Sequence, residues 1–209
     1  MTKDRLETCS DSIFAIVLTL LVLDLRVPLA HGPAGLEQIA PSLLVHAATF
    51  LLVGVFWMLH HGALARVVEV NTRTLTLNLL TLFWITLLPY GAKNAAERPL
   101  EPLGASLISA CCGFHLLSML AMRLSAHSTI DDNPQMKSWR FFRIMLLAIV
   151  AGADLISSVL SWVTPWVGYS AALATVIIWL AMPSPPEVEK KFQIKNGFRR
   201  RTRGIGAAG

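Results

Sequence analysis

Long apolar stretches alternate with short polar segments along most of the chain. Residues 38–65 contain no Asp, Glu, Lys or Arg, and between Ile144 and Pro186 the only such charge is Asp154. A helix needs roughly 20 apolar residues to cross a bilayer, so the second stretch is too long for one span and divides naturally at Thr164-Pro165. We therefore predict six membrane-spanning helices, over residues 8–27, 38–65 (entered through Pro41 near its first turn), 74–92 and 102–122 and in the two halves of 144–186. The longest polar connection is expected over Ser125–Trp139.

Composition also indicates a membrane protein. The chain is 54% hydrophobic and 15% charged, with a mean hydropathy of +0.57, whereas soluble domains carry roughly 25% charged residues. The three cysteines lack the spacing of a disulfide framework or a zinc site. Asp4, Glu7 and Asp11 make a poor leader for a signal peptide, so we expect the first span to be retained.

The charges between the spans predict the orientation. With six spans both termini share one side, which receives fifteen of the 18 Lys and Arg residues, and the other side receives three. Positive charge concentrates on the cytoplasmic side, so both termini are expected in the cytoplasm. Seven of the fifteen lie between Lys190 and Arg203. We therefore assign residues 1–186 to a six-helix transmembrane domain and residues 187–209 to a basic, mobile cytoplasmic tail that contacts anionic lipid rather than nucleic acid.

The first span carries polar residues that a plain anchor lacks. Ser10 and Asp11 stand at the mouth of an apolar helix, and only 12 residues separate Asp11 from Asp24, so at least one carboxylate lies at membrane depth. At about 100° per residue, Asp11 points roughly 140° away from Ile16. One face of the helix collects Ser12, Ile16, Thr19, Leu20, Leu23 and Val27.

Two interpretations of this face are open. It can be a packing stripe, as most such stripes in membrane bundles are. Alternatively, copies of the face meet on a symmetry axis, where rings of Ile and Leu form a constriction with Thr hydroxyls between them, and such apolar constrictions gate ions by dewetting. A water-filled path is easier to build between copies than within six spans, which favours a homo-oligomer. For Asp11, which points off that axis, we prefer a buried hydrogen-bonded network with Ser10 and Arg5.

The other polar residues within spans are ambiguous. His60 and His61 diverge by about 100° on a helix and form no natural chelating pair, so we expect one of them to hydrogen-bond another helix, such as the Ser10–Asp11 region. Asp154 is either a proton-transfer group or the partner of an interhelical hydrogen bond, and Asn78 is similarly ambiguous. Signatures of hydrolases, zinc peptidases and nucleotide-binding loops are missing, as is a TVGYG filter. We therefore expect no enzyme activity and no cofactor.

The N-terminal residues resemble a known family. Arg5-x-x-x-Cys9-Ser10-Asp11, running into the apolar segment Ser12–Leu23, is similar to the RxxxFSD signature that opens the first helix of the transmembrane protein 175 family, which are potassium-permeable channels of lysosomes and bacteria. Trp57-x-x-His60-His61 and the stretch from Asn78 to Tyr90 look like the second and third spans of that family. The signature Phe is Cys9 here, which removes a large aromatic contact at the cytoplasmic mouth.

The resemblance implies a homotetramer of six-helix subunits whose first helices line a central pore. It places the constricting aliphatic residue at Ile16, further pore-lining positions at Leu20 and Leu23, and a hydroxyl linked to potassium preference at Thr19. It also implies that Arg5, Ser10 and Asp11 form a network that holds the pore helices together, and we group His60 and His61 with this network.

The sequence therefore predicts an all-α, potassium-permeable cation channel in a bacterial inner (plasma) membrane. Its expected partners are potassium ions, the lipid bilayer and further copies of the chain, with no bound metal beyond potassium in transit. One alternative is a secondary or proton-coupled transporter that uses Asp154 and the intramembrane histidines. The other is a membrane scaffold that conducts no ions.

Overall fold

The computed structural model describes residues 2–23, 25, 29, 32–65, 67, 70–125 and 134–182, and it is all-helical in these ranges. The predicted tail, residues 187–209, lies outside them. The helices are α1 (Lys3–Leu23), α2 (Pro33–Leu64), α3 (Thr72–Thr86), α4 (Leu88–Glu97), α5 (Pro102–Ser125), α6 (Pro134–Leu160) and α7 (Pro165–Leu180).

Five helical segments in the described part are long and apolar enough to cross a membrane. They are α1, α2, α3 together with α4, α5, and residues Lys137–Leu160 of α6. The sixth apolar segment, α7, has 16 residues, which rise about 24 Å against a hydrocarbon core of about 30 Å. The predicted all-helical, polytopic fold is confirmed, but α7, the sixth predicted span, is shorter than the hydrocarbon core.

Several helix boundaries differ from the prediction. Pro33 occupies the first turn of α2, so Pro41 lies inside that helix instead of at its start. The third span is divided, because α3 ends at Thr86 and α4 begins at Leu88 with a proline in its first turn. At its N-terminus α6 begins at Pro134, so residues 134–139, expected in a polar loop, are helical. The division before Pro165 is confirmed.

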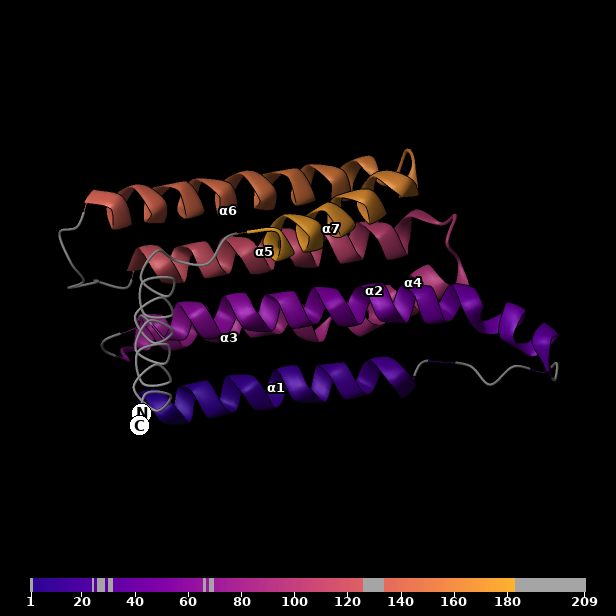
Figure 1. The fold of residues 1–209 in the computed structure, drawn as a ribbon, viewed down its shortest axis with the longest axis horizontal. Helices are drawn as coiled ribbons and strands as arrows, with labels where there is room; N and C mark the ends of the chain where they lie inside the picture. The colour runs from indigo at the N-terminus through magenta and orange to yellow at the C-terminus, as the bar shows by residue number, and fades with distance from the viewer. Residues whose placement is uncertain are drawn as a thin grey trace, which may run out of the picture.

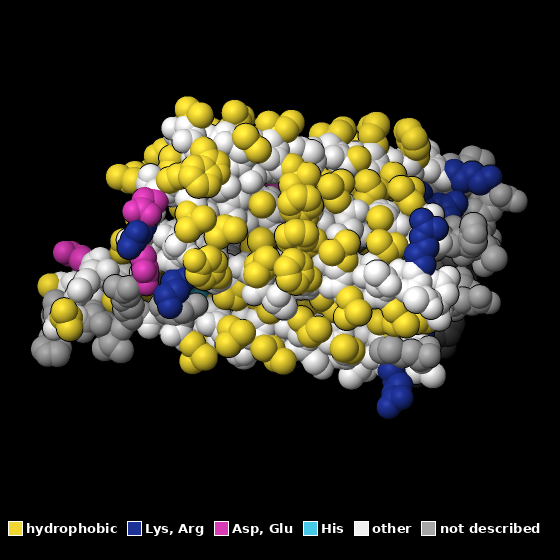
Figure 2. All heavy atoms as spheres, turned by 180° about the vertical axis from the view of Figure 1, so that it is seen from behind, with side chains coloured by type: hydrophobic (Ala, Val, Ile, Leu, Met, Phe, Trp, Pro, Cys, Tyr) yellow, Lys and Arg dark blue, Asp and Glu magenta, His cyan; other side chains and the backbone are white. Residues whose placement is uncertain are grey.

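The helices lie side by side, with α1 at one edge of the bundle and α6 at the other (Figure 1). Between these edges, α5 packs against α3, α4, α6 and α7, and 61% of its apolar segment is buried, compared with 28% for α1. Because α1 contacts the bundle on one side alone, its other side has no neighbour among the described residues. The surface is what a bilayer requires: hydrophobic side chains cover the middle of the face seen in Figure 2, and charged side chains gather at its two ends.

The end of α4 and the start of α5 are packed closely together. A Cβ atom added at Gly104 would lie 2.6 Å from the backbone nitrogen of Ala95, so the two backbones pack in direct contact. At Gly152 in α6, by contrast, an added Cβ would meet nothing within 4 Å.

We expect Gly104→Ala to lower the free energy of unfolding by about 1–3 kcal/mol, because the added methyl group forces the two helices apart. Gly152→Ala is the matched control and is expected to be neutral or to stabilise the protein by up to about 1 kcal/mol through helix propensity. Thermal unfolding of the detergent-solubilised protein measures both changes. Equal melting temperatures for the two variants would contradict the close packing of α4 and α5.

Candidate functional site

The two sides of α1 differ sharply. Its buried residues, spaced by three or four positions, are Leu6, Ser10, Phe14, Val17 and Leu21, the spacing of a helix with one packed side. Its opposite side forms a continuous exposed stripe, which we call the α1 stripe and which comprises Arg5, Thr8, Cys9, Ser12, Ala15, Ile16, Thr19, Leu20 and Leu23. The part of the chain that the structure describes therefore leaves one side of this helix exposed from its first turn to its last.

All four predicted pore-lining residues lie on the α1 stripe. Ile16 is 57% exposed and Leu23 is 77% exposed, and Thr19 and Leu20 are also exposed. Large aliphatic side chains in this position contact either lipid or further copies of the chain. Val27, expected on the same face, lies outside the described residues.

The hydroxyl groups of the α1 stripe bond to their own helix. Thr19 Oγ1 donates to the carbonyl oxygen of Ile16 at 2.7 Å, and Ser12 Oγ donates to the carbonyl oxygen of Thr8 at 2.8 Å. A hydroxyl oxygen has two acceptor lone pairs. Because the backbone takes the hydroxyl proton, the exposed Thr19 oxygen offers acceptor capacity, which suits a cation better than an anion.

Ser10, on the packed side, and the half-buried Asp11 next to it bond to two different helices. The buried Ser10 Oγ donates to the carbonyl oxygen of Leu6 at 2.9 Å and accepts from Asn78 Nδ2 of α3 at 3.1 Å. Asp11 Oδ1 accepts a 2.8 Å hydrogen bond from Trp57 Nε1 of α2. We call Ser10, Asp11, Trp57 and Asn78 the anchor network, because together they fix α1 against α2 and α3.

The structure brings together only some of the residues expected in this network. Arg5 is exposed, and within the described residues no hydrogen bond joins it to Ser10 or Asp11. His60 is buried and contacts α1 by packing, its ring centroid 5.4 Å from that of Phe14. His61 is exposed, its ring 6.1 Å from that of Trp57. No hydrogen bond joins either histidine to the Ser10–Asp11 pair in the described part of the chain.

The sequence analysis did not identify Trp57 and Asn78 as the partners of Asp11 and Ser10. The available signal was chemical: Asn78 is a polar side chain in an otherwise apolar helix, where such a group needs a partner. Trp57 carries an indole N–H that also needs an acceptor when it is removed from water.

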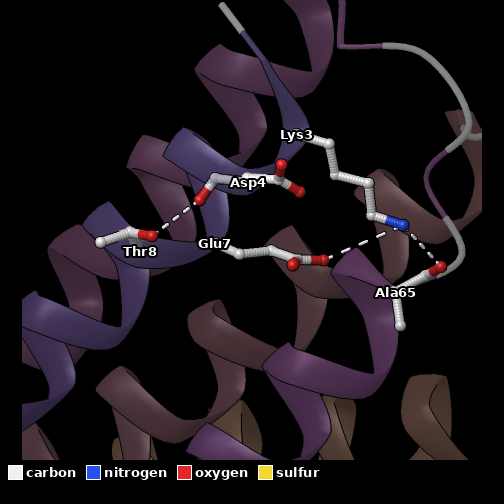
Figure 3. A network of polar contacts seen from close by, with 5 residues as sticks. All are labelled: Lys3, Asp4, Glu7, Thr8 and Ala65. Atoms are coloured by element: carbon white, nitrogen blue, oxygen red, sulfur yellow. Dashed lines mark hydrogen bonds and ion pairs between the residues drawn. The ribbon is translucent and has the colours of Figure 1, made fainter.

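A further set of polar contacts ties the beginning of α1 to the end of α2 (Figure 3). Lys3 Nζ donates to the carbonyl oxygen of Ala65 at 2.8 Å and lies 3.9 Å from Glu7 Oε1. Beside them Thr8 Oγ1 donates to the carbonyl oxygen of Asp4 at 2.8 Å. These contacts hold the first turn of α1 outside the apolar belt.

The isolated acid Asp154 lies on α6, across the bundle from α1 (Figure 1). It is buried and accepts a 3.0 Å hydrogen bond from Thr175 Oγ1 of α7. This is the interhelical hydrogen bond that was one of its two interpretations. Among the described residues, no group of three or more His, Cys, Asp or Glu side chains is placed to hold a metal ion.

The comparisons with known proteins define the class first. A family model described as the endosomal/lysosomal potassium channel TMEM175 matches residues 5–89, which include the α1 stripe and the anchor network. A potassium channel of Chryseobacterium sp. (strain P1-3) is 34% identical over 134 residues, 62% of this chain and 70% of that protein. A potassium channel of Streptomyces collinus is 35% identical over 125 residues, 58% of this chain and 59% of that protein.

The fold has a counterpart among solved structures. The crystal structure of a lysosomal potassium-selective channel TMEM175 homologue from Chamaesiphon minutus matches with a TM-score of 0.69 at 23% identity, covering 85% of this chain and 96% of that chain. The protein is thus a multi-pass membrane protein of an ion-channel class, and that class is not one of enzymes. The chain belongs to the TMEM175 family.

We expect the side chains of Asp11 and Trp57 to be energetically coupled. In a double-mutant cycle with Asp11→Ala and Trp57→Phe, the coupling free energy is expected to be about 1–2 kcal/mol, because the indole N–H bonds a carboxylate in a partly dehydrated site. Unfolding in mixed detergent micelles measures it. The control cycle pairs Ser12→Ala with Trp57→Phe and is expected to show no coupling, since Ser12 bonds its own helix. Similar values in the two cycles would contradict the anchor network.

Proposed function

We propose that this chain is the subunit of a homotetrameric, potassium-permeable cation channel in which four α1 helices line the pore. The observation that carries the proposal is the α1 stripe, which is apolar from Ala15 to Leu23 except for the hydroxyl of Thr19 and is left exposed by the described residues. The opposite face of the helix is packed and is held by the anchor network. Potassium channels among the relatives, and a family match that includes α1, support it.

In this arrangement the Ile16 side chains form the constriction, and Leu20 and Leu23 form further apolar rings. An ion that enters such a ring loses part of its hydration and finds no replacement ligands, so the ring is closed while it is dry and conducts when it is wide enough to hold water. Thr19 lies three residues beyond Ile16, nearly one helical turn. Its hydroxyl oxygen offers an acceptor to the partly dehydrated cation, and potassium, which holds water less tightly than sodium, gains more from that exchange.

The anchor network would set the rotation of α1 about its own axis. A rotation by one residue, about 100°, would replace Ile16 at the pore axis with Val17, which the protomer now buries. Arg5 and His61 are exposed near the same end of the bundle, and we assign them to contacts between subunits that keep the four pore helices in register.

The proposed topology follows the charge distribution along the sequence. Both termini lie in the cytoplasm of a bacterial cell, residues 1–186 form the membrane domain, and the basic residues 187–209 form a tail on the inner face of the plasma membrane.

Ile16→Asn should weaken the discrimination between potassium and sodium, because a polar ring wets the constriction. The measurement is the ratio of potassium to sodium flux in liposomes that contain purified protein. Ile149→Asn is the matched control: Ile149, on α6, is 59% exposed, almost the same as the 57% of Ile16. A flux ratio that is unchanged in Ile16→Asn, or changed equally in both variants, would overturn the assignment of the pore.

The transporter alternative makes the opposite prediction for Asp154. Since Asp154 bonds Thr175 within one protomer, we expect Asp154→Asn to retain potassium flux and discrete single-channel steps in a planar bilayer. Flux that saturates with potassium concentration and is lost in Asp154→Asn would identify a carrier. Absence of flux from the folded wild-type protein would identify a scaffold.

A further inference from the structure

An apolar groove lies between α2 and α7, which contact each other, and α7 crosses in front of α5 (Figure 1). Its volume is about 380 Å³, within the range of roughly 300–1,000 Å³ typical of ligand pockets. The lining includes Leu44 and Ala48 from α2, Leu173 and Val176 from α7, and Ile108 from α5. None of these residues belongs to the α1 stripe or to the anchor network.

The length of the groove matches one leaflet of a bilayer. Along α2 its lining extends from Pro41 to Leu52, a rise of about 16 Å, which is close to half of the roughly 30 Å hydrocarbon core. Along α7 it extends from Trp166 to Val176, about 15 Å. A neighbouring helix would run through the whole membrane, whereas an acyl chain occupies one leaflet.

Two aromatic side chains line the end of the groove nearest the start of α7. Tyr169 lines this end of the groove. It lies one turn from Trp166, with the two rings edge to face and their centroids 6.1 Å apart. Tyr and Trp are enriched at the level where lipid head groups meet the hydrocarbon. The hydroxyl of Thr49, also in the lining, donates to the carbonyl oxygen of Val45 at 2.8 Å and needs no further acceptor.

We propose that this groove binds one acyl chain of a membrane lipid, with the rings of Trp166 and Tyr169 at the level of its head group. The lipid enters from the leaflet at the end where α7 begins, which is the outer leaflet in the topology proposed above. The proposal depends on the membrane-spanning fold and not on ion conduction, so the two can fail separately.

Photocrosslinking tests the proposal. The purified protein is reconstituted in phosphatidylethanolamine and phosphatidylglycerol vesicles that contain a trace of phosphatidylethanolamine with a diazirine on its acyl chain. After illumination, peptide mass spectrometry locates the label, and the expected sites are residues 41–52 of α2 and 166–176 of α7. Ala48→Trp fills the groove and should remove most of this label. Ala47→Trp changes the adjacent exposed alanine, which is not part of the lining, and should retain it.

A second pair of variants separates loss of lipid binding from misfolding. Size-exclusion chromatography shows whether each variant is folded. Leu173→Trp in the groove should also lose the label, and Ile177→Trp, equally exposed on α7 but outside the lining, should keep it.

Two results would overturn the proposal. One is equal labelling of the groove variants and their controls. The other is the absence of label from the wild-type groove together with dissociation of the oligomer in Ala48→Trp and Leu173→Trp, which would assign the groove to a neighbouring subunit.

Discussion

The position of α1 depends on hydrogen bonds made by two adjacent residues, Ser10 and Asp11. Within a bilayer, burying an apolar side chain against a neighbouring helix gains little hydrophobic free energy, because the lipid chains that it leaves are equally apolar. Polar contacts are directional and lose their partners when the helix turns. Asn78 and Trp57 hold this pair from two different helices, so the rotation of α1, and with it the face that it leaves exposed, is determined by a few atoms near one end of the helix.

The helices at the centre of the bundle are packed more extensively than α1 at its edge. Around α5, contacts with α2, α3, α4, α6 and α7 and the close approach at Gly104 form a packed centre. Asp154 and Thr175 link α6 to α7 on the side remote from α1. In contrast, α1 is joined to the remainder at its buried stripe and by the Lys3 contacts at its beginning. A helix attached in this way can be exposed on one side without loosening the rest of the protomer.

Much of this fold follows from the hydrophobic pattern, since a charge-free run of sufficient length has few alternatives to a membrane helix. The exposed face of α1 was also predictable, because the same residues repeat at helical spacing. Helix boundaries at prolines were harder to predict, because Pro33, Pro41 and Pro89 all suit the first turn of a helix. Pro33 and Pro89 do lie in first turns, whereas Pro41 lies inside α2, and the sequence around it does not distinguish the two cases. The partners of Ser10 and Asp11 could not be ranked from the sequence, because the side chain that reaches a given atom depends on how the helices cross. The same is true of the groove between α2 and α7.

The distance along the chain between the members of the anchor network has a consequence for biogenesis. Trp57 follows Asp11 by 46 residues, and Asn78 follows Ser10 by 68. During synthesis α1 therefore enters the membrane before either partner has emerged from the ribosome. Its rotation about its own axis is not fixed by the anchor network until the third span has been inserted. In the tetramer proposed above, assembly through α1 would follow this step, so the order of translation would separate the folding of each subunit from its oligomerisation.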